Sequence, residues 1–180
     1  DHKDIGHVIG FVYNMPFLNG ENMNIRRAKF SDINRLLDIY KKAREYMKAT
    51  GNPHQWKNSY PSKKLVKDDI ENKVCYVIER EGHICACFTF MKGREKSYER
   101  DFSCGKDYGI IHRVASDGSE RGIVREIINF TKKNGLLRID THEDNITMQR
   151  VLENNGFKKL GIVYLHDGSR RILYELKEEL

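Results

Sequence analysis

The sequence has no apolar stretch long enough to cross a lipid bilayer. A membrane-spanning helix needs about 20 consecutive apolar residues, whereas the longest candidate here, Ile84 to Met91, has the length of a strand. The first residues, Asp1-His2-Lys3-Asp4, also lack the basic segment and following apolar run of a secretory signal. We therefore expect a cytoplasmic protein that does not bind membranes.

Cysteine is scarce, with four residues in a chain of 180. No two of them have CxxC spacing, and no histidine set stands at zinc-finger spacing. Cys75, Cys85 and Cys87 fall in strand-like apolar runs, where a cysteine is usually a small buried hydrophobe. We expect reduced thiols, and neither a disulfide nor a metal site.

Acidic residues are outnumbered, since 32 Lys and Arg against 26 Asp and Glu give a net charge of +6. The positive residues are spread along the chain, and no RNP-like aromatic strand or recognition helix accompanies them. Nucleic acid is therefore not a predicted partner. A basic surface would equally attract a polyphosphate ligand.

Residues 1–22 differ from the rest of the chain, with an apolar stretch at 8–13 and a turn at Asn19-Gly20. Regular alternation begins only at Met23, which also reads as a natural start of translation. We interpret 1–22 as an upstream extension, with a genuine interaction arm as the alternative. Residues 23–180 are then one domain, long enough to bury its own core.

The pattern of apolar residues from Met23 onward predicts the order β-α-α-β-β-β-α-β-α-β-β, which is one mixed α/β sheet covered by helices. A long first helix is capped by Ser31, and residues 92–107, polar and glycine-containing, are predicted to be loop. The expected strands are 23–29, 74–78, 84–90, 108–116, 136–141, 158–165 and 170–176, and the later helices are 61–70, 123–134 and 145–154.

Candidate chemistry concentrates at two helix starts. Gly118 and Gly122 lie between a strand and a helix, where glycine lets the backbone turn so that its N–H groups converge on a phosphate. The spacing matches neither a P-loop nor a dinucleotide fingerprint. Further along, Asp144-Asn145 caps a helix that Asn155-Gly156 ends, with Phe157 following. Taken singly, each segment also fits an ordinary turn between strand and helix.

Together and in this order, the two segments resemble the GNAT acyltransferase superfamily, whose members bind acetyl-CoA. That family has a loop of pattern (Gln/Arg)-x-x-Gly-x-(Gly/Ala), and later a helix that follows Asn-x-x-Ala-x-x-Leu-Tyr and ends in Gly-Phe. Here the loop is Ser119-Glu120-Arg121-Gly122-Ile123-Val124, and the helix runs from Asn145 to Leu152 before Gly156-Phe157. The resemblance covers 23–176, and within the superfamily the chain is similar to a bacterial branch of unassigned substrate. It implies a mostly antiparallel sheet flanked by helices and an N-acetyltransferase.

The resemblance also implies which residues bind acetyl-CoA. We expect no metal to take part in this binding. Backbone groups of residues 114–116 pair with the pantetheine arm like an added strand, N–H groups of 119–124 hold the pyrophosphate, and Asn145 contacts the reacting end. The implied set is Val114, Ala115, Ser116, Ser119, Glu120, Arg121, Gly122, Ile123, Val124, Asn145 and Met148.

Three residues depart from the family pattern. Ser119 stands where Gln or Arg is usual, Val124 stands where Gly or Ala is usual, and Leu152 stands where many relatives have a tyrosine that protonates the departing thiolate. These departures favour an alternative, in which a degenerate GNAT fold binds acetyl-CoA as a sensor or scaffold.

Acetyl transfer needs a neutral amine and a route for its protons. Residues 108, 110, 112, 114 and 116 share one face of a regular strand, which places His112 and Tyr108 on the face from which a base can act. We hypothesise that His112 is the general base, directly or through water, and that Asp140 on the next strand orients it. The alternatives are a structural histidine and a loop-capping aspartate.

The acceptor pocket is predicted from the connection between the first two helices, which borders the acceptor cleft in GNAT proteins. Gln55, Trp56 and Tyr60 lie in this connection, where plain packing is the alternative role. The acceptor is expected to be a primary amine of a small molecule or peptide, and a homodimer is expected because dimers are common among such proteins.

Overall fold

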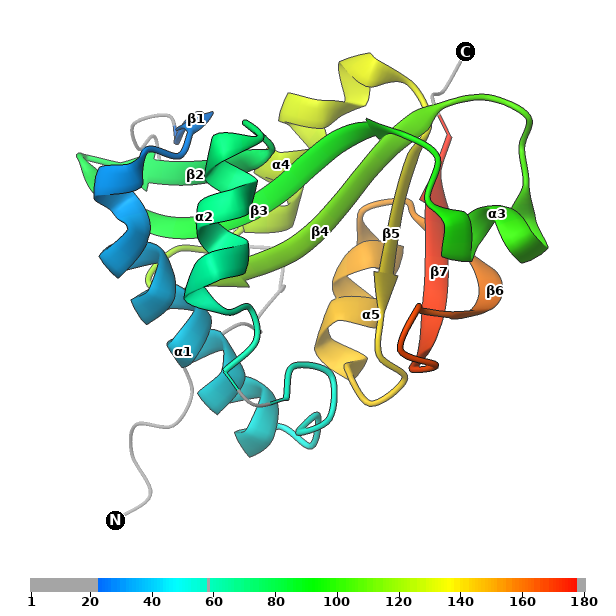
Figure 1. The fold of residues 1–180 in the computed structure, drawn as a ribbon, viewed down its shortest axis with the longest axis horizontal. Coiled ribbons are helices and arrows are strands. Elements are labelled where there is room, and N and C mark those ends of the chain that lie inside the picture. The colour runs from blue at the N-terminus through cyan, green and yellow to red at the C-terminus, as the bar shows by residue number, and fades with distance from the viewer. Residues whose placement is uncertain (1–22, 58, 178–180) are drawn as a thin grey trace.

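The structure is a computed structural model that describes residues 23–57 and 59–177. They form a seven-stranded sheet of order β1-β2-β3-β4-β5-β7-β6, antiparallel except for the parallel pair β4 and β5 (Figure 1). This is the mixed sheet flanked by helices that the sequence predicts. Its strands are β1 (Asn24–Arg27), β2 (Cys75–Arg80), β3 (His83–Gly93), β4 (Tyr108–Ser116), β5 (Leu137–Thr141), β6 (Lys158–Tyr164) and β7 (Arg170–Leu176), and its helices are α1 (Ile33–Ala49), α2 (Lys63–Glu71), α3 (Lys96–Phe102), α4 (Ile123–Thr131) and α5 (Ile146–Asn154).

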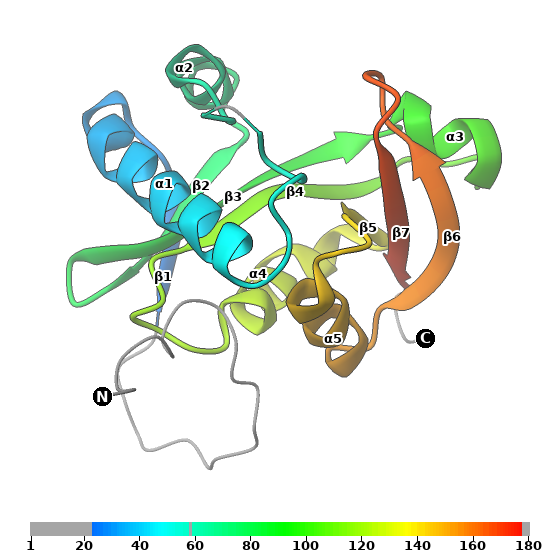
Figure 2. The same ribbon diagram turned by 90° about the horizontal axis from the view of Figure 1, so that it is seen from below.

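Helices cover both faces of the sheet, with α1 and α2 on one face and α4 and α5 on the other (Figure 2). The core is divided accordingly. On the α1 face, Leu36, Tyr40 and Val66 pack with Val77 of β2, whereas the α4 face has its own cluster. Buried residues of that second cluster include Ile78, Phe88, Ile111, Ile127, Ile139 and Leu152.

One local expectation about the N-terminal half is wrong. Helix α1 starts one residue later than expected, because Phe30–Asp32 forms a 3-10 turn and Asp32, not Ser31, is the residue before the helix. The Asp32 carboxylate accepts a hydrogen bond of 2.7 Å from the Lys29 amide and pairs with Arg26 of β1 at 2.8 Å. Asp32 therefore joins the first strand to the first helix.

The segment predicted as loop, 92–107, contains the end of β3 and helix α3. Most residues of α3 are charged, yet the segment is helical. Glu95 caps this helix by accepting a hydrogen bond from the Ser97 amide at 3.4 Å. The helix is held by its two aromatic residues: Tyr98 is fully buried, and the Phe102 ring fills the space above Gly161, where a Cβ would lie 2.5 Å from it. Both contacts are made with distant segments, which a local pattern does not reveal.

Strands β4 and β5 separate after a short junction. They pair at only three positions, Gly109 with Leu137, Ile110 with Arg138 and Ile111 with Ile139. Figure 1 shows the two strands diverging beyond that point. The register of β4 against β3 also shifts near Arg113, which has a positive φ of 50°.

The irregularity at Arg113 is a β-bulge, and it corrects the expectation that residues 108 to 116 alternate regularly. His112 faces Tyr98, and Arg113 then turns to the same side of the sheet, where it binds Asp69 of α2. Val114 consequently packs on the α4 side and Ala115 on the α1 side. His112 and Val114 therefore lie on opposite faces.

All four cysteines are free thiols, as expected, and three of them are buried. Burial raises the pKa of Cys75 to about 12 and that of Cys85 to about 11. In the described part of the chain, no helix has the length and apolar character needed to cross a membrane. The extension proposed for residues 1–22 lies outside the described residues, so the domain division stays a prediction.

Candidate active site

A cavity of about 530 Å³ lies where β4 and β5 separate. Its wall includes residues from both faces of the sheet: His112 and Asp140 from the α1 side, and Val114 and Met148 from the α4 side. The cavity therefore passes through the sheet. Its further lining residues are Met47, His54, Gln55, Trp56, Lys57, Tyr60, Glu95, Ser97, Arg113, Ile139, Thr141, Asn145, Leu165, His166, Asp167, Ser169 and Arg171.

His112 and Asp140 lie together as predicted, and a third residue, Tyr98 of α3, joins them. His112 Nε2 is 2.8 Å from the Tyr98 hydroxyl and 3.4 Å from Asp140 Oδ2. The Tyr98 hydroxyl donates its single proton to Asp140, an ionised carboxylate that can only accept. The phenol oxygen must then accept from an N–H at His112 Nε2. In neutral His112, the basic ring nitrogen is consequently Nδ1.

The electrostatics of this cluster favour an anionic Asp140. Burial alone would raise the pKa of Asp140, but the hydrogen bond and charge of His112, the Tyr98 hydroxyl and the charge of Arg171 together lower it below its ordinary value. Burial, and then the charge of Asp140, raise the pKa of Tyr98 well above its ordinary value. Tyr98 is therefore a neutral donor, and Asp140 holds a fixed negative charge behind the imidazole.

The three residues predicted for the acceptor wall all line the cavity. Trp56 is buried, with its ring 6.0 Å from that of Tyr60. The Gln55 side-chain oxygen accepts from Asn145 at 2.8 Å, and its backbone oxygen accepts from Arg171 at 3.3 Å. The connection between α1 and α2 is thus fixed to the cavity by hydrogen bonds as well as by packing.

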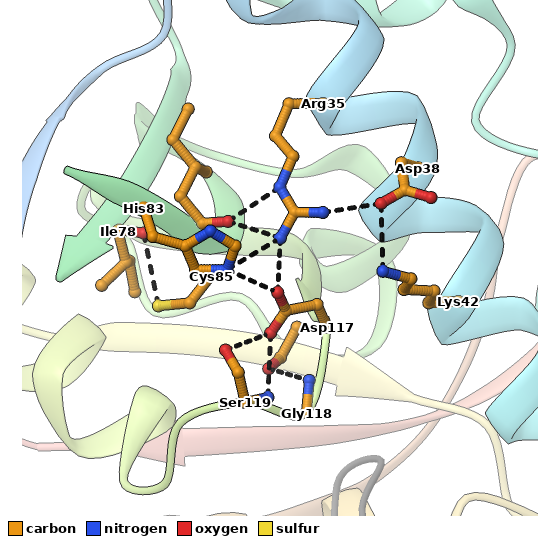
Figure 3. A network of polar contacts seen from close by, with 11 residues as sticks. Arg35, Asp38, Lys42, Ile78, His83, Cys85, Asp117, Gly118 and Ser119 are labelled. Atoms are coloured by element: carbon orange, nitrogen blue, oxygen red, sulfur yellow. Dashed lines mark hydrogen bonds and ion pairs between the residues drawn. The ribbon is translucent and has the colours of Figure 1, made fainter. Parts of the chain in front are cut away.

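The loop from Asp117 to Gly122 is held by a polar network (Figure 3). The Asp117 carboxylate binds Arg35 of α1 and lies 3.0 Å from His83 Nε2 of β3. It also accepts from the Ser119 amide at 2.9 Å, so this amide, which was assigned to the pyrophosphate, is already engaged. The Asp117 carboxylate therefore fixes the shape of the loop.

The remaining loop residues present mainly backbone. Gly122 precedes α4 with a φ of 75°, a conformation that glycine adopts without strain. The Glu120 carboxylate pairs with Arg80 of β2. Ile123 is buried and Val124 packs against the same core, so their amides, at the positive end of α4, are the groups directed at the loop.

The other predicted cosubstrate contacts fall into two groups. Met148 and Val114 line the cavity, whereas the Ala115 side chain is buried against α1 and Ser116 accepts from the Gly118 amide at 3.0 Å. Asn145 caps α5 as predicted, accepting from the Met148 amide at 3.1 Å and donating to the loop residue Gln55. Its side chain is thus engaged at both ends.

Tyr108 does not belong to the cavity wall. It is fully buried, its hydroxyl accepts from the Glu95 amide at 3.0 Å, and the Arg138 guanidinium lies 4.4 Å from the centre of its ring. These contacts stabilise the start of α3 rather than a reacting group. Regular alternation placed Tyr108 on the right face but could not show that α3 covers it.

Among the residues to which sequence reasoning gave no role are Thr141 and Arg171 of the cavity wall, and Tyr98, a fully buried residue outside the wall that contacts His112 and Asp140. Tyr98 and Arg171 contact Asp140, and the buried Thr141 hydroxyl has no hydrogen-bond partner among the described residues. Burial does not alternate along β7, where Arg171 follows the exposed Arg170 and begins a run of buried residues, so the local pattern gave no signal for it. Across residues 23–57 and 59–177, no group of three or more His, Cys, Asp and Glu side chains is arranged to hold a metal ion.

No family model matches the chain, and no curated protein does either. Among solved structures, a GNAT-family acetyltransferase from Streptococcus agalactiae is 28% identical, with a TM-score of 0.79 over 91% of this chain and 100% of that one. A second, from Listeria monocytogenes, is 20% identical, with a TM-score of 0.67 over 92% and 100%.

A third structure, of yncA from Salmonella typhimurium, is assigned as an acetyltransferase and contains its cofactor acetyl-CoA. It is 15% identical, with a TM-score of 0.58 over 89% of this chain and 96% of that one. Sheet order, the parting of β4 from β5 and these structural neighbours agree with the sequence motifs. The chain has the fold of the GNAT acetyltransferases and is similar to them over most of its length.

Proposed function

We propose that the chain is an acetyl-CoA-dependent N-acetyltransferase that passes the acetyl group directly to a primary amine. The observation that carries this proposal is the cavity through the sheet, whose wall includes residues from both faces. The acetyl donor would enter from the α4 side and the amine from the α1 side. The acetyl-CoA bound to the Salmonella typhimurium neighbour supports this choice of donor.

The residues on the donor side suit acetyl-CoA. Beyond Ile111, the edge of β4 that faces β5 is no longer paired with it, so the backbone of 114–116 can hydrogen-bond an extended pantetheine arm. The start of α4 favours the negative pyrophosphate. The buried, unpartnered Thr141 hydroxyl in the cavity wall would gain a partner from a polar atom of the bound thioester.

On the acceptor side, His112 acts as the general base through Nδ1. The amine nitrogen bonds to the acetyl carbonyl carbon, the carbon–sulfur bond breaks, and CoA leaves as a thiolate that takes up a proton. The proton lost by the amine passes to Nδ1, directly or through water. Asp140 and Tyr98 stabilise the resulting imidazolium from the opposite side of the ring.

Leu152 favours a second candidate function, an acetyl-CoA sensor or scaffold without turnover. Its side chain is fully buried in the core on the α4 face and offers no proton to a departing thiolate. The two functions share the donor site and differ in turnover.

Thermal melting with and without excess acetyl-CoA tests the donor site. Ligand at 100 times its dissociation constant stabilises the folded state by about 2.7 kcal/mol, so we expect a clear rise in melting temperature. Absence of a shift would refute acetyl-CoA binding and both functions with it.

Release of free CoA thiol in the presence of an amine panel then separates enzyme from sensor. His112→Ala should abolish transfer yet keep the melting shift, because His112 lies on the acceptor side. Unchanged rates in this variant would eliminate His112 as the base.

A further inference from the structure

The hydroxyl of Thr141, at the end of β5, is a buried polar group without a hydrogen-bond partner in the described part of the chain. Across residues 23–57 and 59–177, four buried side-chain atoms lack such a partner, and they belong to Tyr40, Asn52, Glu99 and Thr141. Thr141 is the one of these four residues that lines the cavity. Buried hydroxyls are normally hydrogen-bonded. The Thr141 hydroxyl therefore points to a ligand group that is not part of the chain.

The register of the sheet places Thr141 on the α4 side, from which the proposed acetyl donor enters. Strand β5 pairs with β7 without a shift, so side chains alternate from face to face along it. Thr141 is opposite Ile172, which belongs to the core on the α4 face, whereas Asp140 contacts His112 on the other side. Two consecutive residues of one strand thus reach the two sides of the cavity.

Thr141 also lies where the two central strands separate. The pairing of β4 with β5 ends at Ile111 and Ile139, two residues before Thr141. The proposed pantetheine arm would follow the free edge of 114–116 into the same gap. The thioester at the end of this arm has two polar atoms, a carbonyl oxygen and a sulfur. Because divalent sulfur is a weak acceptor, the carbonyl oxygen is the stronger partner for a hydroxyl.

We propose that Thr141 is a catalytic residue whose hydroxyl donates a hydrogen bond to the acetyl carbonyl oxygen. The proposal rests on the acetyl-CoA site of the proposed function. When the amine nitrogen bonds to the carbonyl carbon, an electron pair moves onto that oxygen. The pair returns as the carbon–sulfur bond breaks and its electrons leave with sulfur. A hydrogen bond that strengthens while the oxygen is negative lowers the barrier to transfer.

This role differs from that of the tyrosine that Leu152 replaces. An aliphatic hydroxyl is a far weaker acid than a thiol, so Thr141 keeps its proton and does not protonate the departing thiolate. Thr141 stabilises the oxygen of the thioester rather than its sulfur. The residue can therefore act in this chain without any change at Leu152.

Acetyl-CoA and S-ethyl-CoA are a matched pair of ligands for this hydrogen bond. Both have the CoA body, the sulfur and a two-carbon group, and only acetyl-CoA has the carbonyl oxygen. Calorimetric titration without an amine gives both dissociation constants, so the comparison does not depend on turnover. We expect the unaltered protein to prefer acetyl-CoA, and Thr141→Val to reduce this preference by about 3- to 10-fold, the effect of one hydrogen bond between neutral groups. Thr141→Ser keeps the hydroxyl and should keep the preference.

Turnover and stability give two further measurements. With any amine that the panel shows to be acetylated, Thr141→Val should lower kcat by about 10- to 100-fold and change the KM of the amine little. The same variant should melt a few degrees higher without ligand, because valine has the shape of threonine and no unsatisfied hydroxyl. Thr131→Val is the matched control, since Thr131 is equally buried but donates to the Ile127 carbonyl at 2.7 Å. This control should gain no stability and keep the ligand preference.

The results that overturn the proposal are distinct from those that overturn acetyl-CoA binding. If Thr141→Val weakens both ligands equally, or neither, or leaves kcat unchanged, Thr141 does not bind the carbonyl oxygen during transfer. If the unaltered protein binds acetyl-CoA without preferring it to S-ethyl-CoA, the donor site stands and the Thr141 assignment alone fails. If neither ligand binds, the proposed function fails and the assignment fails with it.

Discussion

Replacement of Asp140 by asparagine should destabilise the fold, whatever acceptor the protein uses. The carboxylate is buried and interacts with Tyr98, His112 and Arg171. Asparagine has nearly the same shape but no charge, so it leaves the buried Arg171 guanidinium without a counter-ion. Loss of one partner from a buried ion pair costs about 3–5 kcal/mol. The melting temperature should fall by about 10 °C, since each kcal/mol is worth about 2–4 °C in a chain of this size.

The direction of the Asp140 pKa shift determines how the stability lost in Asp140→Asn changes with pH. Asp140 has a pKa below its ordinary value of 3.8 in the folded protein. Its contribution is therefore fully present above pH 3.8 and is lost as the pH falls through the lower, folded pKa. The asparagine variant has no such group to titrate. The difference in unfolding free energy between the two proteins should be large at pH 7 and should shrink in strong acid.

Urea unfolding followed by circular dichroism, at pH 7 and at steps below pH 4.5, measures this difference. Asp107→Asn is the matched control, because Asp107 is 59% exposed in its pair with Arg94 and should cost less than about 1 kcal/mol. Equal stability of Asp140→Asn and the unaltered protein at pH 7, or a difference that stays constant into acid, would refute the assignment of Asp140 as a buried anion.

Three further predictions concern other parts of the molecule. Gly109→Ala places a Cβ 2.7 Å from Leu137 at the β4–β5 junction and should cost about 1–3 kcal/mol in chemical denaturation, whereas Gly93→Ala, with open space around its Cβ, should be near neutral. Native protein should react rapidly with a thiol reagent only at Cys104, because the other three thiols are buried, and fast labelling of all four would contradict the fold. Asp117→Asn should reduce the acetyl-CoA melting shift by loosening the loop that it ties to α1, and an undiminished shift would remove that role.

Much of the fold could be predicted because its signals are local. The bounds of β4 match the predicted strand at 108–116, since a mostly apolar, β-branched segment lies there between a polar loop and Gly118. Asn145 was identified as a helix cap because a side-chain acceptor precedes an apolar periodic segment. In both places the sequence neighbours supply the physical cause.

The parts that could not be predicted depend on distant contacts. The sequence of α3 resembles a charged loop, because the contacts that stabilise the helix, Tyr98 with Asp140 and Phe102 with Gly161, involve residues far away in the chain. The bulge at Arg113 lacks the glycine that commonly marks a positive φ, so alternation was continued through it. His112 and Asp140 were paired correctly because they lie on strands expected to be adjacent, whereas Tyr98 reaches them only through tertiary folding.

The two sides of the cavity are encoded by different stretches of the chain. Under the proposed function, the acceptor side takes its wall chiefly from residues 47–60 and 165–171, and the donor side takes its wall from residues 114 and 145–148. Mutations that reshape the first group need not alter the second. If the proposed function holds, a duplicated gene could change the acceptor through the first group while the residues proposed for the acetyl donor stay the same. The separation of β4 from β5 would thus allow acceptor specificity to change without a change in the residues that bind the acetyl donor.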